Sequence, residues 1–346
     1  MIKGLNIFSY FKYYIKMGSL FDFCNKEESN YNPESYSCIP KIENGYNDLS
    51  YKELKEEINK RVKIIKRKEK NKDYSYKDYN EEFYILGSYI DDDNNHYNAL
   101  EEGHQELCRY SDIKTYKHNN LEINTKKKYI NASPIKINNK FLFISTQGPL
   151  PNTIEDFWIM VDQYNSNLVL MLCNLKELGR EKCANYWDVN KIGNYTIIPS
   201  EKEDDNIDKS KIVIREIIIK NNLTNNEKTI TQIHYKGWPD HGAPDIKDAY
   251  KDFLYMIKKV DEIKNENPAV VHCSAGVGRT GTFISIYCLF KEIMSQIKNE
   301  KLENIHFSVF NMVRKLKEMR LLMVQSNEQY KFIYDFIDYL LQENNI

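Results

Sequence analysis

The sequence lacks the features that would place it in several large classes of protein. No stretch approaches the ~20 consecutive apolar residues that a transmembrane helix needs, and no segment repeats. Neither sign of charge is in excess, because 49 basic and 50 acidic residues give a net charge of -1, which argues against nucleic-acid binding driven by bulk charge. The seven cysteines are odd in number and lack the paired spacing of zinc ligands. We therefore expect no membrane span, metal site or nucleic-acid partner.

The N-terminal part of the chain shows little regular pattern. Residues 1–37 are expected to be a poorly ordered tail. Its aromatic-rich start is interrupted by lysines, which makes it a poor signal peptide; a weak interfacial helix is the alternative. Spaced apolar residues predict a helix over 49–68 with a narrow apolar stripe. They are Leu54, Ile58, Val62 and Ile65.

Apolar periodicity predicts strands in the middle of the chain and helices concentrated towards its C-terminal end. The expected strands are Phe141–Ser145, Leu168–Leu172, Tyr195–Ile198, Ile212–Ile219, Thr229–Tyr235 and the short run at 270–271. The expected helices are Thr153–Tyr164, Asp245–Ile263, Thr280–Met294, Ser308–Met319 and Ser326–Leu341. A polar turn at 221–228 indicates a hairpin. This order favours an α/β (α+β) fold, with a mixed twisted central sheet flanked by helices.

The most informative segment is a cysteine followed, after five residues, by an arginine. Cys273 and Arg279 enclose the small, uncharged residues Ser274, Ala275, Gly276, Val277 and Gly278. Unobstructed backbone N–H groups and the positive end of the following helix form an anion cradle. Arg279 adds a planar fork that matches two phosphate oxygens. Cys273 is expected to be a thiolate, because a helix N-terminus lowers the usual cysteine pKa of ~8.5 to roughly 3.5–7.5.

A nucleophile and an oxyanion site in one loop indicate phosphoryl chemistry. The spacing alone is weak, since a buried cysteine is more often inert core. The flanking His272, the glycines, Thr280 and the strand–loop–helix context favour the catalytic interpretation. The loop is not a nucleotide-binding P-loop, which ends in Gly-Lys-Ser/Thr, because Arg279 and Thr280 occupy those places.

The segment from His272 to Gly281 resembles the signature of the cysteine-dependent protein tyrosine phosphatases, in their phosphotyrosine-specific branch. The resemblance runs from about residue 79 to the C-terminal helix and implies a catalytic domain over 79–344, with residues 38–78 as a helical extension packed on it. A solvated linker helix is the alternative for that extension. The resemblance implies that Cys273 attacks phosphorus, Thr280 hydrogen-bonds its sulfur, and His272 supports the loop.

Trp238-Pro239-Asp240, between Gly237 and Gly242, is similar to the mobile loop of that family. The resemblance makes Asp240 the general acid, which the chemistry needs because a phenolate leaves faster when it is protonated as the bond breaks. Trp238 would anchor the hinge of the loop. The alternative is a Pro-Asp turn with a helix-capping aspartate.

Three further segments resemble loops of the family. Gln325 would position the hydrolytic water, with Gln329 as the second candidate, although Ser326 and Gln329 also form a capping box. Glu177 would hold Arg279, with Lys182 near the acid loop. Tyr110 would stack on the substrate ring and Asp112 would accept hydrogen bonds from the substrate backbone.

The chain departs from the family at two places. The recognition loop lacks its usual internal Asp–Arg pair, since Lys117 and Asn120 stand there. Beside Arg320, Lys317 stands where the family has a second arginine, so a second anion pocket is expected to be weaker, because lysine cannot make bidentate contacts.

The resemblance implies a cytoplasmic protein-tyrosine phosphatase that acts on phosphotyrosine-containing proteins without a cofactor or metal. A free thiolate also suits a reducing compartment. The competing hypotheses are a pseudophosphatase that only binds phosphotyrosine, and a phosphoinositide phosphatase. A pseudophosphatase usually lacks the nucleophile, the arginine or the acid, and here Cys273, Arg279 and Asp240 are all present. The uncharged loop 274–278 argues against a phosphoinositide phosphatase. The oligomeric state stays open.

Overall fold

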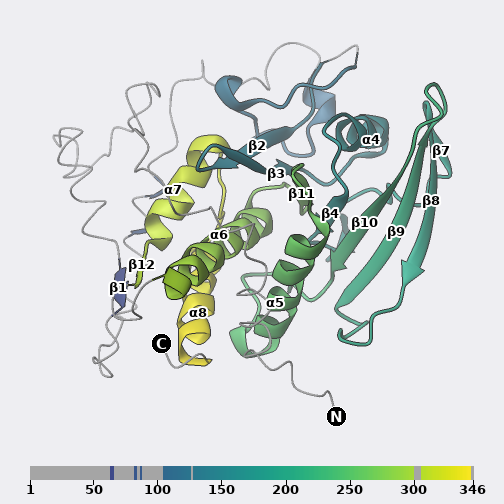
Figure 1. Cartoon of the computed structure of the whole chain (residues 1–346). Coiled ribbons are helices and arrows are strands. Elements are labelled where there is room, and N and C mark those ends of the chain that lie inside the picture. The colour runs from purple at the N-terminus through teal and green to yellow at the C-terminus, as the bar shows by residue number, and fades with distance from the viewer. Residues whose placement is uncertain are drawn as a thin grey trace.

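The computed structural model describes residues 104–125, 128–299 and 305–343, together with 63–65, 82–83 and 86–87. Its main sheet has eight strands in the order β2-β3-β11-β4-β10-β9-β8-β7 (Figure 1). Their bounds are β2 Ala132–Ile137, β3 Lys140–Thr146, β4 Leu168–Met171, β7 Lys191–Ile192, β8 Tyr195–Lys202, β9 Ile212–Asn221, β10 Glu227–Tyr235 and β11 Ala269–His272. Two-stranded pairs join β5 Lys176–Glu177 to β6 Arg180–Glu181, and β1 Lys63–Ile65 to β12 Ile305–Phe307.

The centre of the sheet is parallel and its flanks are antiparallel. Strand β11 pairs in parallel with β3 and β4, and β4 pairs in parallel with β10. Every residue of β4 and β11 is buried, as expected for strands covered on both faces. The expected hairpin is confirmed, because β9 returns antiparallel as β10 across the turn after Asn221. In Figure 1, strands β7 to β10 extend to one side as a wing.

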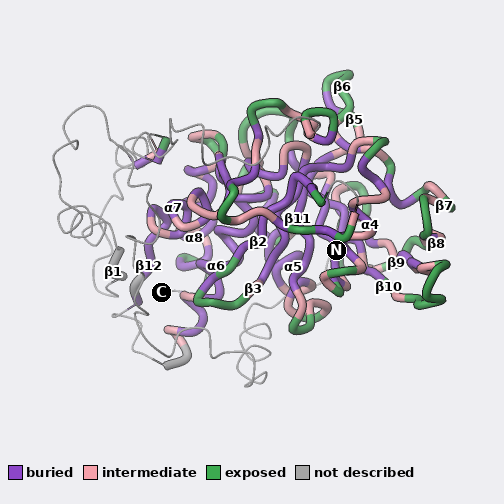
Figure 2. Tube along the Cα trace, turned by 90° about the horizontal axis from the view of Figure 1, so that it is seen from above, coloured by how far each residue is buried: buried purple, intermediate pink, exposed green. Residues whose placement is uncertain are grey.

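Helices cover both faces of the parallel centre. Helix α4 (Ile154–Gln163) lies on one side, and α5 (Ile246–Ile263), α6 (Gly278–Asn299), α7 (Val309–Met319) and α8 (Asn327–Glu343) gather on the other (Figure 1). Short 3-10 turns occur at Gln105–Leu107, Lys117–Asn119 and Pro151–Thr153. The side chain of Asp245 accepts from the backbone N–H of Lys247 at the start of α5, which fixes that end. Figure 2 shows the buried residues running through the central strands and these helices.

The mixed twisted sheet with flanking helices is confirmed, and the helices begin and end within a few residues of the expected positions. The predicted helix over 49–68 is wrong at Lys63–Ile65, which form strand β1 paired antiparallel with β12. Partner strands decide such short segments, and apolar spacing within one segment does not show its partner. The rest of 38–78, and the whole of 1–37, lie outside the described residues. No helix in the described part of the chain could span a membrane.

The topology places the candidate loop at the middle of the sheet. Strand β11 lies between β3 and β4, and Cys273 follows its last residue directly. Helix α6 then begins at Gly278, so the intervening loop lies between the carboxyl end of a buried strand and the amino end of a helix. This is the place where open α/β sheets bind ligands.

Candidate active site

The loop after β11 curls tightly around the sulfur of Cys273. The backbone N–H of Gly276 donates to Cys273 Sγ at 3.3 Å. Gly276 has a φ of +71°, and a Cβ added there would lie 2.1 Å from the carbonyl oxygen of Thr146 at the end of β3. Only glycine meets both conditions. A Cβ added at Gly148 would likewise lie 2.7 Å from the carbonyl oxygen of Cys273, so the loop is packed closely from this side as well.

Arg320 holds the outer side of the loop. Its side chain is fully buried and donates to the carbonyl oxygens of Gly276 at 2.9 Å and Ala275 at 3.2 Å, and to Asn131 Oδ1 at 2.7 Å. Burial lowers its pKa to about 10, so the guanidinium stays charged at neutral pH. Arg320 thus bonds two carbonyls of the loop from within the core.

Lys317, one turn before Arg320 in the chain, is enclosed in a similar way. Lys317 is buried too, and its ammonium group donates to the carbonyl oxygen of Val324 at 3.4 Å. Burial lowers its pKa to about 8. Both side chains are enclosed and bonded to the backbone, and the weaker second anion pocket stays a prediction.

Arg279 is fixed as a fork over the loop. Its two terminal nitrogens bond the two carboxylate oxygens of Glu177, at 2.6 and 2.8 Å. Burial lowers the pKa of Arg279, but the hydrogen bonds and charge of Glu177 outweigh it and raise the pKa above its usual value. One nitrogen also donates to the carbonyl oxygen of Pro239 at 3.2 Å. The predicted role of Glu177 in orienting Arg279 is confirmed, and Arg279 also touches the loop that carries Asp240.

The loop with Asp240 is attached through Trp238. The indole of Trp238 is buried and donates to the carbonyl oxygen of Gly242 at 3.1 Å, and it packs against Phe253 and Phe332. Asp240 itself is exposed and lines the pocket. The loop is therefore anchored at its buried tryptophan, while the exposed Asp240 lies at the edge of the cavity.

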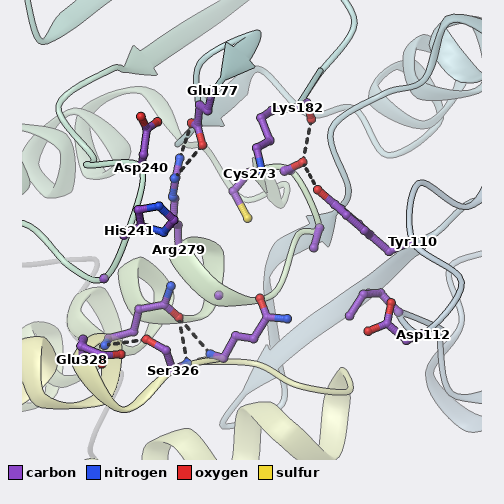
Figure 3. Close-up of a pocket in the computed structure, with 17 residues that line it drawn as sticks. Tyr110, Asp112, Glu177, Lys182, Asp240, His241, Cys273, Arg279, Ser326 and Glu328 are labelled. Carbon is purple, nitrogen blue, oxygen red and sulfur yellow. Dashed lines mark hydrogen bonds and ion pairs between the residues drawn. The ribbon is translucent and has the colours of Figure 1, made fainter. Parts of the chain in front are cut away.

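The predicted residues come together around one cavity of about 710 Å³. In Figure 3, Cys273 lies at its centre, with Asp240, His241 and Arg279 on one side and Tyr110 on the other. The lining residues are Tyr110, Asp112, Ile113, Glu177, Lys182, Asp240, His241, Gly242, Cys273, Ser274, Ala275, Gly278, Arg279, Gln325, Ser326, Glu328 and Gln329. Of the predicted set, Gly276, Val277, Thr280, His272 and Trp238 lie behind this lining.

Tyr110 is joined directly to the cysteine loop. Its hydroxyl and Ser274 Oγ are 2.8 Å apart, and Ser274 Oγ donates to the carbonyl oxygen of Lys182 at 2.9 Å. The segment lacks the usual Asp–Arg pair, but another residue of the same segment holds it in place. The amide of Asn119 donates to the carbonyl oxygens of Met319 and Pro134 at 2.7 and 2.9 Å. The recognition loop is thus tied both to the active-site loop and to the end of α7.

The glutamine segment shows one of its two predicted roles, helix capping. Gln329 Oε1 accepts from the backbone N–H groups of Gln325 and Ser326, at 2.9 and 3.3 Å, and Ser326 Oγ accepts from the backbone N–H of Gln329 at 3.3 Å. The capping box at the start of α8 is therefore confirmed. With the Gln329 carbonyl engaged in capping, the exposed Gln325 at the pocket wall is the better candidate for positioning water.

Thr280 does not make its predicted contact. Its hydroxyl oxygen is buried and has no hydrogen-bond partner in this structure, so the predicted bond to the sulfur is wrong here, and the N–H of Gly276 takes that place. Burial raises the pKa of the nearby Cys183 to about 12 and that of Cys173 well above its usual value. Both stay protonated at neutral pH.

His272 supports the loop from inside the core. It is fully buried, and its Nδ1 lies 3.1 Å from the carbonyl oxygen of Cys273. Burial lowers its pKa to about 4, although the bond to the Cys273 carbonyl opposes that shift, so the ring is neutral. Sequence analysis missed its partner Tyr186, and it missed the role of Arg320. Neither has a local signal, because both act through contacts more than 40 residues away in the chain.

Comparisons with known proteins show the family of this chain. Residues 104–339 match a family model described as protein-tyrosine phosphatase. The chain is 39% identical over 207 residues to the mouse receptor-type tyrosine-protein phosphatase eta, covering 59% of this chain and 16% of that one. It is 34% identical over 248 residues to the human tyrosine-protein phosphatase non-receptor type 20, covering 67% of this chain and 54% of that one. The chain thus spans at most about half the length of these relatives.

Solved structures agree on the fold. The catalytic domain of human protein tyrosine phosphatase non-receptor type 18 superposes with a TM-score of 0.66 at 25% identity, covering 77% of this chain and 96% of that chain. A second structure of the same phosphatase, from work on its recognition of HER2 tyrosine phosphorylation sites, has a TM-score of 0.62 at 26% identity and covers 70% and 86%.

Proposed function

Because the chain belongs to the protein-tyrosine phosphatase family, we propose that it hydrolyses phosphotyrosine in proteins through a phosphocysteine intermediate. One observation carries this proposal: Cys273, Arg279 and Asp240 all line one cavity, although Asp240 lies on another loop than the other two. Each of the three supplies a group that phosphoryl transfer needs, namely a nucleophile, a charge clamp and an acid.

In the first step the thiolate of Cys273 attacks phosphorus, and the bond from phosphorus to the tyrosine oxygen breaks. The leaving oxygen keeps the bonding electron pair and takes a proton from the carboxyl group of Asp240. Arg279 and the backbone N–H groups of the loop stabilise the charge on the three remaining oxygens. Because Glu177 already orients the guanidinium fork, little reorganisation is needed as that charge develops.

In the second step a water molecule attacks the phosphocysteine. Asp240, now ionised, takes a proton from this water, and Gln325 holds it in line. The bond between sulfur and phosphorus breaks, which returns the thiolate and releases phosphate. Gly276 supports the leaving sulfur, because its N–H already points at that atom.

The depth of the cavity supports selectivity for tyrosine. Tyr110 forms one wall and is held by Ser274 of the loop itself, so the distance from the rim to Cys273 is set by a fixed aromatic ring. A phosphotyrosine side chain reaches the sulfur from that rim, whereas the shorter phosphoserine does not. The uncharged lining of loop residues 274–278 favours this substrate over multiply charged inositol phosphates.

The test is hydrolysis of matched peptides that differ only in phosphotyrosine or phosphoserine. We expect kcat/KM to be far higher for phosphotyrosine, vanadate to inhibit, and Tyr110→Ala to narrow the gap. Tyr110→Phe is the matched control, since it keeps the ring and loses only the bond to Ser274. Equal kcat/KM for both peptides would replace this proposal by a dual-specificity phosphatase, and binding without turnover would replace it by a binding module.

We infer the class of substrate and the cellular compartment from the chemistry of the proposed site. The proposed substrates are phosphotyrosine-containing proteins, and a catalytic thiolate needs a reducing environment, which favours the cytoplasm and a role in signal transduction. A substrate-trapping variant, Asp240→Ala, incubated with phosphoproteins and compared with Cys273→Ser, would identify which ones bind. Retention that vanadate does not release would show binding outside the active site.

A further inference from the structure

A chain of hydrogen bonds runs from strand β9 through the core to the nucleophile. Arg215 on β9 donates to Gln232 Oε1 on the neighbouring strand β10 at 2.9 Å. Gln232 Nε2 lies 2.7 Å from the hydroxyl oxygen of Tyr186, which lies 2.9 Å from Nε2 of His272. The Nδ1 of His272 then lies 3.1 Å from the carbonyl oxygen of Cys273. Gln232, Tyr186 and His272 are all fully buried.

The direction of each bond in this chain is set by what its partners can donate and accept. A guanidinium only donates, so the oxygen of the Gln232 amide must face Arg215 and its NH₂ group must face Tyr186. The hydroxyl of Tyr186 therefore accepts from Gln232 and gives its single proton to Nε2 of His272. A neutral imidazole with an accepting Nε2 carries its proton on Nδ1, and that N–H points at the Cys273 carbonyl. The sulfur of Met171, 3.9 Å from both Tyr186 and Gln232, is a weaker and more distant acceptor.

Arg215 is itself fixed in this orientation. Its guanidinium lies 4.6 Å from the centre of the Trp187 ring, and its outer nitrogen contacts Glu201 at 3.3 Å. Gln232 and Arg215 are direct cross-strand partners in the register of β9 and β10. The direction of the whole chain is thus set by a cation at the sheet, on a strand that contributes nothing to the cavity lining.

We propose that Gln232 and Arg215 are positioning residues for the reaction: they fix the Nδ1–H tautomer of His272, and so orient the peptide between Cys273 and Ser274. A hydrogen bond to the Cys273 carbonyl turns the N–H of Ser274 to the opposite side of that peptide, towards the phosphate, and polarises it as a donor. The inference rests on the proposed function for its effect on rate, but the tautomer itself is a property of the free protein.

Gln232→Glu reverses the chain while keeping its shape. The introduced carboxylate pairs with Arg215 and can only accept, so the Tyr186 hydroxyl turns towards it and its oxygen then accepts from Nε2–H of His272. We expect Nδ1 to lose its proton and kcat to fall on the order of 10–100-fold, the usual effect of losing an outer partner of a catalytic group. Gln232→Leu is the matched control, because Tyr186 still donates to His272, and it should lower kcat only a few-fold.

The double variant Gln232→Glu/Tyr186→Phe separates direction from packing. The second substitution removes the Tyr186 hydroxyl, whose oxygen would otherwise accept from Nε2–H of His272 and so favour the Nε2–H tautomer. The kcat of the double variant should therefore equal that of Tyr186→Phe alone. If Gln232 acts only through packing or stability, the isosteric glutamate should be milder than leucine, and the second substitution should add to the loss. Either of those results overturns the proposal. Thermal unfolding of each variant checks that the comparison is made on folded protein.

The tautomer is read directly from long-range ¹H–¹⁵N NMR spectra of protein with ¹⁵N-labelled histidine. The signals of His272 are identified among the seven histidines by their loss in His272→Gln. We expect Nδ1–H in the unmodified protein and an unprotonated Nδ1 in Gln232→Glu. Protonated Nε2 in the unmodified protein, or a protonated Nδ1 in Gln232→Glu, overturns the inference even if the phosphatase activity is as proposed. An inactive protein with the expected tautomers would count against the proposed function alone.

Discussion

The structure holds the two loops of the proposed active site in different ways. The loop from Cys273 to Arg279 is buried and bonded from behind by Arg320, by His272 and by the close approach of β3. The loop around Asp240 is exposed and is held mainly by the buried indole of Trp238 and one bond from Arg279 to Pro239. The difference fits the proposed roles, in which the first loop is a fixed binding site for the phosphoryl group and the second carries an acid that closes over it.

The largest expected effect comes from a variant that tests whether the loop from Cys273 to Arg279 still binds phosphate when it cannot hydrolyse the substrate. Cys273→Ser should abolish turnover, because a protonated hydroxyl attacks phosphorus poorly, while the loop N–H groups and Arg279 still hold phosphate. Calorimetry should show phosphotyrosine-peptide binding close to that of the unmodified protein. Hydrolysis of an aryl phosphate above a few per cent of the original rate would remove Cys273 from the nucleophile role.

The exposed loop should matter for rate and hardly at all for stability. Asp240→Ala should lower kcat by roughly 10²–10⁴-fold, the usual contribution of a general acid, and change the free energy of unfolding by less than about 0.5 kcal/mol, as for other exposed positions. The loss should shrink for aryl phosphates with acidic phenols, which leave without a proton. An equal loss for all leaving groups would contradict the assignment.

Substitutions behind the loop from Cys273 to Arg279 should instead lower the free energy of unfolding. Arg320→Leu takes the donor away from the carbonyl of Ala275 and from Asn131 Oδ1, while Ser145 Oγ still donates to the carbonyl of Gly276. Each buried acceptor left without a donor costs roughly 1–3 kcal/mol, partly offset because a desolvated charge is removed. We expect urea denaturation to show a loss of about 3 kcal/mol, against almost none for Asp240→Ala. Similar unfolding midpoints for the two variants would show that the loops do not differ in this way.

The smallest effect concerns pH and the buried histidine of β10. His234 donates through Nε2 to the carbonyl oxygen of Cys173 at 2.8 Å, and burial lowers its pKa to about 3. Below about pH 6.5, the usual pKa of a histidine in the unfolded chain, the unfolded chain binds a proton at His234 and the folded protein does not. The free energy of unfolding therefore decreases as the pH is lowered from about 6.5 to about 3. Between pH 7 and pH 5 this amounts to about 2 kcal/mol.

The measurement is the difference in unfolding free energy between pH 7 and pH 5, for the unmodified protein and for His234→Gln, whose amide can also donate to Cys173. The glutamine variant should lose about 2 kcal/mol less on acidification, and the titration of all other groups cancels in the comparison. Equal slopes for the two proteins would show that His234 is protonated in the folded state.

The sequence by itself determined the parts that depend on local chemistry. A cysteine, five small residues and an arginine between a strand and a helix specify an anion cradle wherever they occur, because backbone N–H groups and a helix terminus supply it. Likewise Ser326 and Gln329 are close enough in the chain to form the capping box that the structure shows. The helices of the C-terminal half followed from their 3.6-residue periodicity.

Only the tertiary structure decided which distant residues hold that cradle in place. Arg320 was expected beside a second anion pocket, yet it lies fully buried and bonds the loop carbonyls, and Thr280 lost its expected contact with the sulfur. Strand β1 took the place of a predicted helix because it pairs with β12 across more than 200 residues. Hydrogen bonds of buried polar groups depend on which segments meet in space, and the order of residues along one segment does not contain that information.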